Sequence, residues 1–392
     1  MKKMEFRVLQ MKKRRTQESD EISELPGHIT DLILSRLPIK DAVRTSILSR
    51  KWRYKWSSHS ILAQYRTSVL SHTGFLTKGD IDPWILHLSR GCIREIALYV
   101  CNGEKYKIPT SLFDCRDLIC LTLYGCLAKI PSSFEGFKNL DALYLEHVEL
   151  SPHGLEALAS RCPLLKHLTL KNLEGITQVT IEARNLESLY IGGAFLDVTF
   201  GVMNSLKSVR VGFNNNIKNR QEPNNANSNN LHEFFRDIHN IQILKIETYS
   251  LKYLAVAKVP QTLSYAFGHL KYLSTCIDFN SKEEILNVMC LIRSSPQLQK
   301  VEFQNRSKNQ QTKWINFWKD HHLCCLEQVQ EVTMDVIYGT EPEMEFIEFL
   351  LASLRNLQTM TFRLDVEIGE MEVLIEMNYF RRASPQAKVF VL

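Results

Sequence analysis

The stretch from Leu118 to Ile191 repeats one short pattern that decides the fold: LICLTL (118–123), LDALYL (140–145), LKHLTL (165–170) and LESLYI (186–191). Each copy fits the template L-x-x-L-x-L with conservative apolar swaps, and successive copies start about 20–25 residues apart. Such a unit contributes one short strand and a returning segment, and it cannot cover its own apolar edge. Neighbouring units are therefore expected to stack into one continuous core.

The template continues on both sides of this stretch, with looser spacing after residue 206. In a leucine-rich chain, some of these weaker copies are also expected by chance. Helical returns are predicted over 155–159 and 283–289, and the asparagine-rich segment 214–230 is predicted to be a solvated loop. The pattern predicts a leucine-rich-repeat solenoid over 82–320 with a parallel concave sheet. The further copies are Ile93-Ile96-Leu98, Leu206-Val209-Val211, Ile241-Leu244-Ile246, Leu298-Val301-Phe303, Val329-Val332-Met334, Leu357-Met360-Phe362 and a degenerate Leu270-Leu273.

The strand residues between the inward-pointing leucines are expected to line the concave surface. Tyrosine and arginine are favoured anchors at protein interfaces, so this column is a candidate substrate-binding surface. The two cations in it, Arg210 and Lys245, favour an acidic partner. The alternative is that a solvated sheet face carries polar residues in any case. The candidates are Tyr144, Thr169, Tyr190, Arg210 and Lys245 of this column, together with Lys171 at the next outward position of its strand.

The N-terminal segment 20–56 reads DEISELPGHITDLILSRLPIKDAVRTSILSRKWRYKW. Its apolar residues first recur at helical spacing, and Pro38 stops that helix because proline lacks an amide hydrogen. Asp41 is placed to cap a second short helix, and a basic, Trp-rich third helix follows Ser49. Three such helices are too few to close a core, so a partner is expected.

This helix trio resembles an F-box, the module that docks onto a Skp-family adaptor within cullin–RING ubiquitin ligases. The resemblance implies an adaptor-facing apolar surface on the first helix, its proline boundary and the two following helices. The alternative is an ordinary helical bundle formed with the repeats. The residues implied are Leu25, Pro26, Ile29, Leu32, Ile33, Leu37, Pro38, Val43 and Trp52.

The C-terminal region extends the resemblance. Ser294-Ser295-Pro296 is similar to a motif of plant F-box proteins, and 325–362 followed by 371–392 resembles the FBD domain, read as strand, helix, strand, helix, strand. The chain is thus identified as a member of the plant F-box/FBD/LRR-repeat family. An α/β fold follows as an expectation: a three-helix F-box, a solenoid, and an FBD-like cap. The expected segments are a basic disordered tail (1–19), the F-box (20–66), the solenoid (82–320) and the FBD-like region (321–392).

Composition sets limits on other functions. A net charge of +5 is modest and gives little support to nucleic-acid binding. No apolar run is long enough for a membrane-spanning helix, and no secretory signal is visible. The cluster 321–325 (HHLCC) lacks zinc-ligand spacing, and phosphate-loop, dinucleotide, metalloprotease and nucleophile-elbow motifs are absent. We therefore expect neither metal, cofactor nor catalysis.

The resemblance implies a substrate-recognition subunit of an SCF-type ligase. Its expected partners are a Skp-family adaptor, a cullin scaffold and an unknown protein substrate. A protein-interaction scaffold without ligase function and a ligand-sensing receptor remain alternatives. The expected location is the nucleus, the cytoplasm or both. The basic run 12–15 fits either a nuclear-import signal or a solvated tail.

Overall fold

The structure is a computed structural model. It describes residues 24–37, 41, 45, 52, 55, 67–72, 78–89, 93–101, 104–195, 197–213, 231–247, 249–254, 261–307, 317–320, 328–365, 375–377 and 379–392. Predictions for residues 1–19, Pro38, Val43, 214–230 and 321–325 fall outside this part of the chain. No helix among the described residues is long and apolar enough to cross a membrane.

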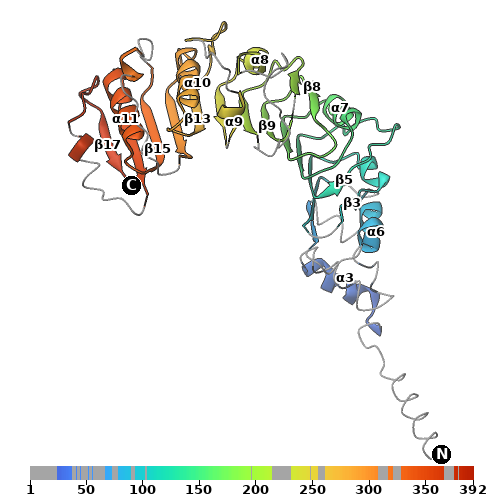
Figure 1. Ribbon diagram of the computed structural model, residues 1–392. Helices are drawn as coiled ribbons and strands as arrows, with labels where there is room; N and C mark the ends of the chain where they lie inside the picture. Colours follow the sequence, from blue (N-terminus) through green and yellow to red (C-terminus); the bar gives the residue numbers. More distant parts are fainter. Residues whose placement is uncertain are drawn as a thin grey trace, which may run out of the picture.

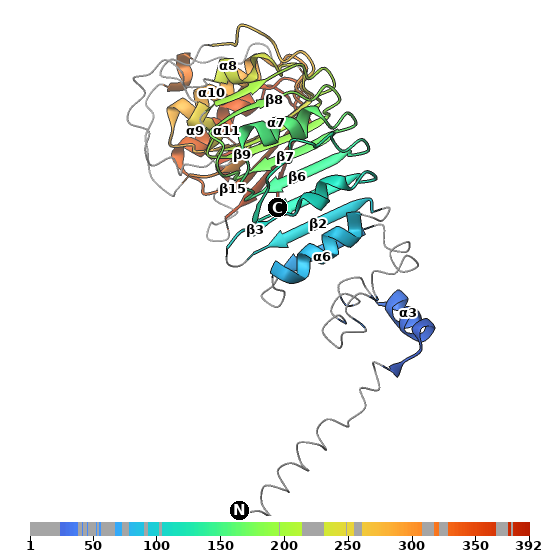
Figure 2. The same ribbon diagram turned by 90° about the vertical axis from the view of Figure 1, so that its right-hand side faces the viewer.

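One parallel sheet of 13 strands runs through the molecule in the order β1-β2-β4-β6-β7-β9-β11-β12-β13-β14-β15-β16-β17. Two short parallel pairs, β3 with β5 and β8 with β10, lie outside it. Figures 1 and 2 show the strands side by side along an arch. The strands are β1 (Thr67–His72), β2 (Glu95–Val100), β3 (Tyr106–Lys107), β4 (Cys120–Tyr124), β5 (Cys126–Leu127), β6 (Ala142–Glu146), β7 (His167–Lys171), β8 (Gln178–Ile181), β9 (Ser188–Gly193), β10 (Asp197–Phe200), β11 (Ser208–Phe213), β12 (Ile243–Ile246), β13 (Tyr272–Ile277), β14 (Lys300–Asn305), β15 (Glu331–Ile337), β16 (Thr359–Leu364) and β17 (Lys388–Val391).

The repeated leucines form the core, as the pattern predicted. In β6 and β7, for example, Leu143 pairs with Leu168 and Leu145 with Leu170, and all four side chains are buried. The apolar positions of the looser copies are buried in the same way, so these copies are genuine repeats. Even the degenerate copy forms a strand, β13, where buried Thr275 takes the third apolar position. The predicted α/β solenoid with a parallel sheet is confirmed.

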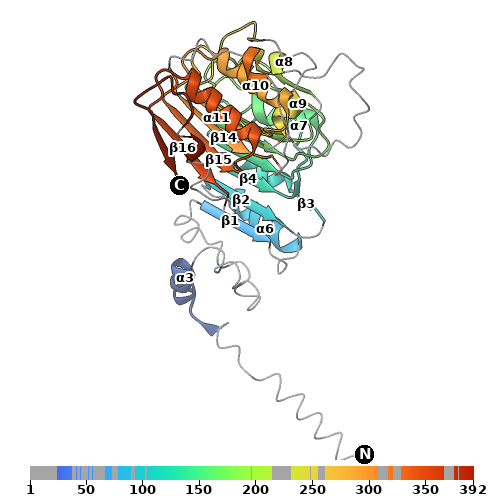
Figure 3. The same ribbon diagram turned by 60° about the vertical axis from the view of Figure 1, so that its left-hand side comes forward.

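Helices return the chain along the outer side of the arch, and the sheet lines the inner side (Figures 1 and 3). The predicted returns are confirmed as α7 and α10, each with a serine at its N-cap that accepts a hydrogen bond from a backbone amide in the first turn. The helices are α3 (Gly27–Arg36), α6 (Lys78–Ser89), α7 (Pro152–Ser160), α8 (Leu231–Arg236), α9 (Ser250–Leu254), α10 (Lys282–Arg293) and α11 (Glu341–Ser353), with 3₁₀ turns η3 (Thr110–Asp114) and η4 (Phe317–Asp320).

The sheet begins earlier than the leucine pattern indicates. The strand β1 pairs in parallel with β2, with Val69 opposite Ala97, and α6 connects the two strands. The sequence of β1, TSVLSH, lacks the L-x-x-L-x-L spacing, so the repeat template does not detect it. The segment 84–89 forms the second half of α6.

A left-handed residue ends several strands at the same point of the repeat. In four repeats, the residue two positions after the third apolar residue of the template has a positive φ. The values are 69° at Gly125, 52° at His147, 49° at Asn172 and 123° at Gly193. At Gly125 the requirement is strict, because a Cβ there would lie 2.1 Å from the Val100 carbonyl oxygen. The repeat therefore leaves the sheet through one recurring backbone turn.

The FBD-like region is built from β15, α11, β16, a helical turn at 375–377 and β17, in the predicted order of element types. Its strands extend the main sheet in register, since Met334 pairs with Phe362 and Phe362 with Val391. The region therefore continues the solenoid, and β17 is the last strand of the sheet.

Candidate protein-interaction surfaces

The helix α3 begins and ends where prolines place its boundaries. Pro26 occupies the N-cap, and its carbonyl accepts hydrogen bonds from the amides of Ile29 (3.0 Å) and Thr30 (3.1 Å). The helix ends at Arg36, and Leu37 is extended with ψ 143°, as expected for a residue before a proline. In Figure 1, α3 lies at one end of the arch, away from the C-terminal strands.

Two large apolar side chains of α3 face solvent. Leu32 is 51% exposed and Ile33 is 38% exposed, whereas Thr30 and Leu34 on the opposite side of the helix are almost fully buried. Leu25 and Leu37 are half-buried and pack against the core, and Pro26 is exposed. Exposed neighbouring apolar residues on one helix face are typical of a surface that a partner covers.

The structure corrects one member of the predicted adaptor surface. Trp52 is only 3% exposed and is part of the buried core, as Leu34 is, so in this chain it is a core residue. Trp52 had been placed on this surface by the resemblance to an F-box. We define the α3 surface as Pro26, Ile29, Leu32 and Ile33.

The predicted concave residues lie in one continuous row across the sheet. Tyr144 is opposite Thr169, which is opposite Tyr190. Tyr190 is opposite Arg210, which is opposite Lys245. Lys171 lies in the neighbouring row, where its ammonium is 2.6 Å from the carboxylate of Glu146. The structure therefore brings all six predicted substrate-binding residues onto one face.

Tyr190 and Arg210 of this row form a cluster with Glu247, which follows β12. The Tyr190 hydroxyl donates to Oε2 of Glu247 at 3.2 Å, and Arg210 Nε is 3.2 Å from Oε1 of the same carboxylate. The Arg210 guanidinium also lies 5.5 Å from the centre of the Tyr190 ring. The ring rests over Gly212, where an added Cβ would be 3.0 Å from the tyrosine hydroxyl. Glycine at 212 thus leaves room for the ring.

A second cluster repeats this arrangement further along the sheet. Lys245 Nζ lies 5.4 Å from the centre of the Tyr272 ring, and the Tyr272 hydroxyl donates to Glu302. Tyr272 was not among the predicted residues, because it precedes the second apolar position of its repeat and lies opposite Ile243, outside the row chosen from the sequence. All three cations in the predicted site, Lys171, Arg210 and Lys245, therefore already have internal anionic or aromatic neighbours.

The tyrosines of these clusters act as neutral hydrogen-bond donors. Burial, followed by the neighbouring Glu247, raises the pKa of Tyr190 to about 12. Burial and the hydrogen bond to Glu302 raise the pKa of Tyr272 to about 12. Tyr144 is 36% exposed, and burial of the remainder raises its pKa as well. The face offers tyrosine rings, hydroxyls and pre-paired charges, which suit recognition of a polypeptide.

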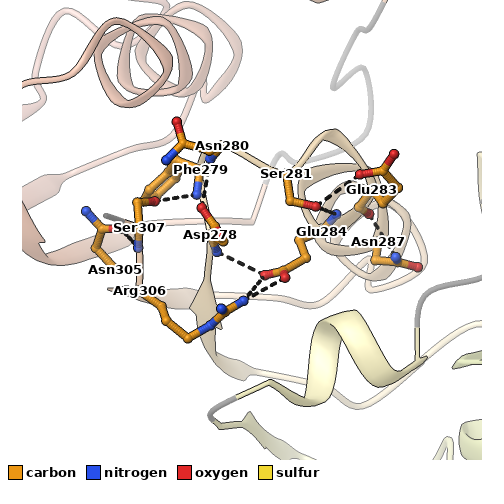
Figure 4. A network of polar contacts seen from close by, with 10 residues as sticks. All are labelled: Asp278, Phe279, Asn280, Ser281, Glu283, Glu284, Asn287, Asn305, Arg306 and Ser307. Atoms are coloured by element: carbon orange, nitrogen blue, oxygen red, sulfur yellow. Dashed lines mark hydrogen bonds and ion pairs between the residues drawn. The ribbon is translucent and has the colours of Figure 1, made fainter. Parts of the chain in front are cut away.

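A polar network joins the residues after β13, the first turn of α10 and the residues after β14 (Figure 4). Glu284, at the third position of α10, receives two hydrogen bonds from Arg306 Nη2, at 2.6 and 2.8 Å, and one from the Asp278 amide at 2.9 Å. A glutamate at the third position of α11, Glu343, plays a similar part. Its buried carboxylate accepts hydrogen bonds from the Asn305 side chain and from the backbone amides of Tyr338 and Thr340. The Arg306 guanidinium also lies 4.4 Å from the centre of the Tyr249 ring.

Among the described residues, no group of three or more His, Cys, Asp or Glu side chains is arranged to hold a metal ion. The pKa values of the buried thiols Cys115 and Cys126 are raised to about 12 by burial, so these thiols stay protonated. These cysteines act as small core residues.

Comparison with known proteins gives matches over most of the chain. A model of the F-box domain matches residues 22–64, and a model described as the LRR repeats of FBD-associated F-box protein At5g56370 matches residues 81–301. The F-box/FBD/LRR-repeat protein At1g13570 of Arabidopsis thaliana is 30% identical, over 95% of this chain and 98% of its own length. The F-box/FBD/LRR-repeat protein At5g56420 of the same plant is 24% identical, over 87% and 90%.

Proposed function

Because this chain belongs to the F-box/FBD/LRR-repeat proteins, we propose that it is the substrate-recognition subunit of an SCF-type cullin–RING ubiquitin ligase. The observation that carries the proposal is the exposed apolar pair Leu32 and Ile33, which lies within the matched F-box. An F-box is a protein-interaction module that typically binds Skp-family adaptors. In this proposal the α3 surface binds the adaptor, and the adaptor connects the chain to a cullin.

The concave face is the proposed substrate surface. It presents Tyr144, Tyr190 and Arg210 in one row, residue types that are favoured as interface anchors. Glu247 holds Tyr190 and Arg210 in place, so little entropy of these two side chains is lost on binding. The subunit itself is proposed to be non-catalytic. It holds substrate lysines close to the charged ubiquitin carrier, which raises their effective concentration.

The proposal is tested by proximity labelling in cells with the proteasome blocked. Proteins that the wild-type chain labels under these conditions are candidate substrates if, with the proteasome active, they become more abundant in a variant whose α3 surface no longer binds the adaptor. The proposal requires such proteins, together with the cullin, among the labelled set. Labelled partners whose abundance is unaffected by the α3 variant, and a cullin that does not co-purify, would favour a scaffold without ligase function.

A charge swap separates the internal role of Arg210 from direct contact with a substrate. Arg210→Glu is expected to weaken capture of an identified substrate about tenfold or more, because an interface arginine anchor typically contributes about 2 kcal/mol. The double variant Arg210→Glu with Glu247→Arg restores an internal ion pair. If Arg210 contacts the substrate, binding measured by calorimetry stays weak in the double variant. Recovery of full affinity there would assign Arg210 to the internal cluster alone.

A further inference from the structure

Among the described residues, the strand β17 is hydrogen-bonded to another strand on one side only, the side of β16. The amides of Lys388 and Leu392 donate to the Gln358 and Phe362 carbonyls of the β16 side, each at 2.9 Å. Because successive residues of a strand alternate direction, Val389 and Val391 point their amides and carbonyls away from β16. Within the described chain, no residue forms a backbone hydrogen bond with these groups.

The side chains of β17 leave this edge unprotected. Phe390 is 46% exposed and Leu392 is 71% exposed, while Val389 and Val391 are half-buried. β-Branched and aromatic residues favour strand pairing, and an open apolar edge is a template for another strand. Lys388, at the start of the strand, is the only charged residue in Lys388–Leu392.

The edge is complementary to itself. A twofold axis at Phe390 would place Val389 of one copy opposite Val391 of the other, and these are the two residues whose backbone groups point outward. Lys388 would lie opposite Leu392 of the second copy, so no like charges would face each other. Only an antiparallel pair satisfies this symmetry.

We propose that two copies of the chain associate through antiparallel pairing of their β17 strands, which joins the two sheets into one. The contact is small beside the roughly 1,200–2,000 Å² of a standard interface, so the dissociation constant is expected in the micromolar range. The α3 surface lies at the other end of the arch and stays free in the dimer (Figure 1). This inference is independent of the ligase proposal.

Sedimentation equilibrium of the full chain, from about 1 to about 200 µM, measures this association. The wild type is expected to shift from monomer to dimer over this range. Val391→Pro removes an outward amide that β16 does not use, so it is expected to stay monomeric with an unchanged circular dichroism spectrum. Val391→Thr keeps the amide and is the matched control. A wild type that is monomeric throughout overturns the proposal, as does a folded Val391→Pro chain that dimerises normally.

A charge exchange at Phe390 tests the register. Phe390→Lys and Phe390→Glu should each be monomeric, because identical charges would face each other across the axis. An equimolar mixture of the two variants should dimerise again. Association through the exposed α3 surface would not respond to residue 390. Failure of the mixture to recover, with both variants folded, overturns the proposed register.

Discussion

A chain carrying Leu32→Asp and Ile33→Asp is expected to bind a Skp-family adaptor about a hundredfold or more weaker than the wild type. Each buried anchor at an interface typically contributes about 2 kcal/mol, and about 1.4 kcal/mol corresponds to a tenfold change in affinity. Both side chains already face solvent in the free chain, so the substitutions remove little internal packing. Pull-down with purified adaptor, followed by calorimetry, measures the loss.

The matched control is Leu164→Asp. Leu164 is 50% exposed, close to the 51% of Leu32, and it lies between α7 and β7, outside the matched F-box. This variant is expected to bind the adaptor normally, and all variants should keep the wild-type melting temperature within a few degrees. Full adaptor binding by the folded double variant would remove α3 from the adaptor surface.

Replacing Glu284 by alanine is expected to lower the free energy of unfolding by about 3–5 kcal/mol, because it leaves the charge of Arg306 without its buried partner. Glu284 is nearly inaccessible to solvent, and Arg306 is largely covered (Figure 4). The variant also removes the acceptor for the Asp278 amide. Urea unfolding measures the change, and Glu283→Ala, an exposed neighbour in the same helix turn, is the control.

The reciprocal variant Arg306→Met predicts a dependence on pH. Burial raises the pKa of Glu284 above its usual value of 4.5, even beside Arg306, and loss of the cation would raise this pKa further. A carboxyl whose pKa is higher in the folded state than in the unfolded state lowers the free energy of unfolding as the pH rises from the unfolded-state pKa to the folded-state pKa. The free energy of unfolding of Arg306→Met should therefore lie far below that of the wild type at neutral pH, and the difference should become smaller toward pH 4.5. A deficit independent of pH would mean that Glu284 is not left as a buried charge.

The sequence predicted those parts of the molecule that depend on local periodicity. Leucine spacing identified the strands that carry the template, and the proline at position 38 located the end of α3. Strand β1 was missed because its pairing with β2 does not require the leucine template. Trp52 was assigned to the surface by the resemblance to an F-box, and its burial depends on tertiary packing that helical spacing does not encode.

For the substrate candidates too, the local features were predicted from the sequence and the tertiary contacts were not. The alternation of a strand is local, and it correctly placed Tyr144, Tyr190 and Arg210 on one face. The side chains that these residues contact come from other repeats. Which residues lie opposite each other depends on the lengths of the loops between the strands, and these lengths are unequal. Glu247 lies 57 positions from Tyr190, so the carboxylate that holds the ring and the guanidinium was not assigned to the site from the sequence.

In the proposed function, one chain carries two separable surfaces, one for the adaptor and one for the substrate. Size-exclusion chromatography with light scattering of the chain mixed with adaptor, cullin and an identified substrate tests it most directly. We predict one complex for the wild type, loss of adaptor and cullin alone with Leu32→Asp/Ile33→Asp, and loss of substrate alone with Arg210→Glu. A folded wild-type chain that elutes apart from adaptor and cullin would contradict the account.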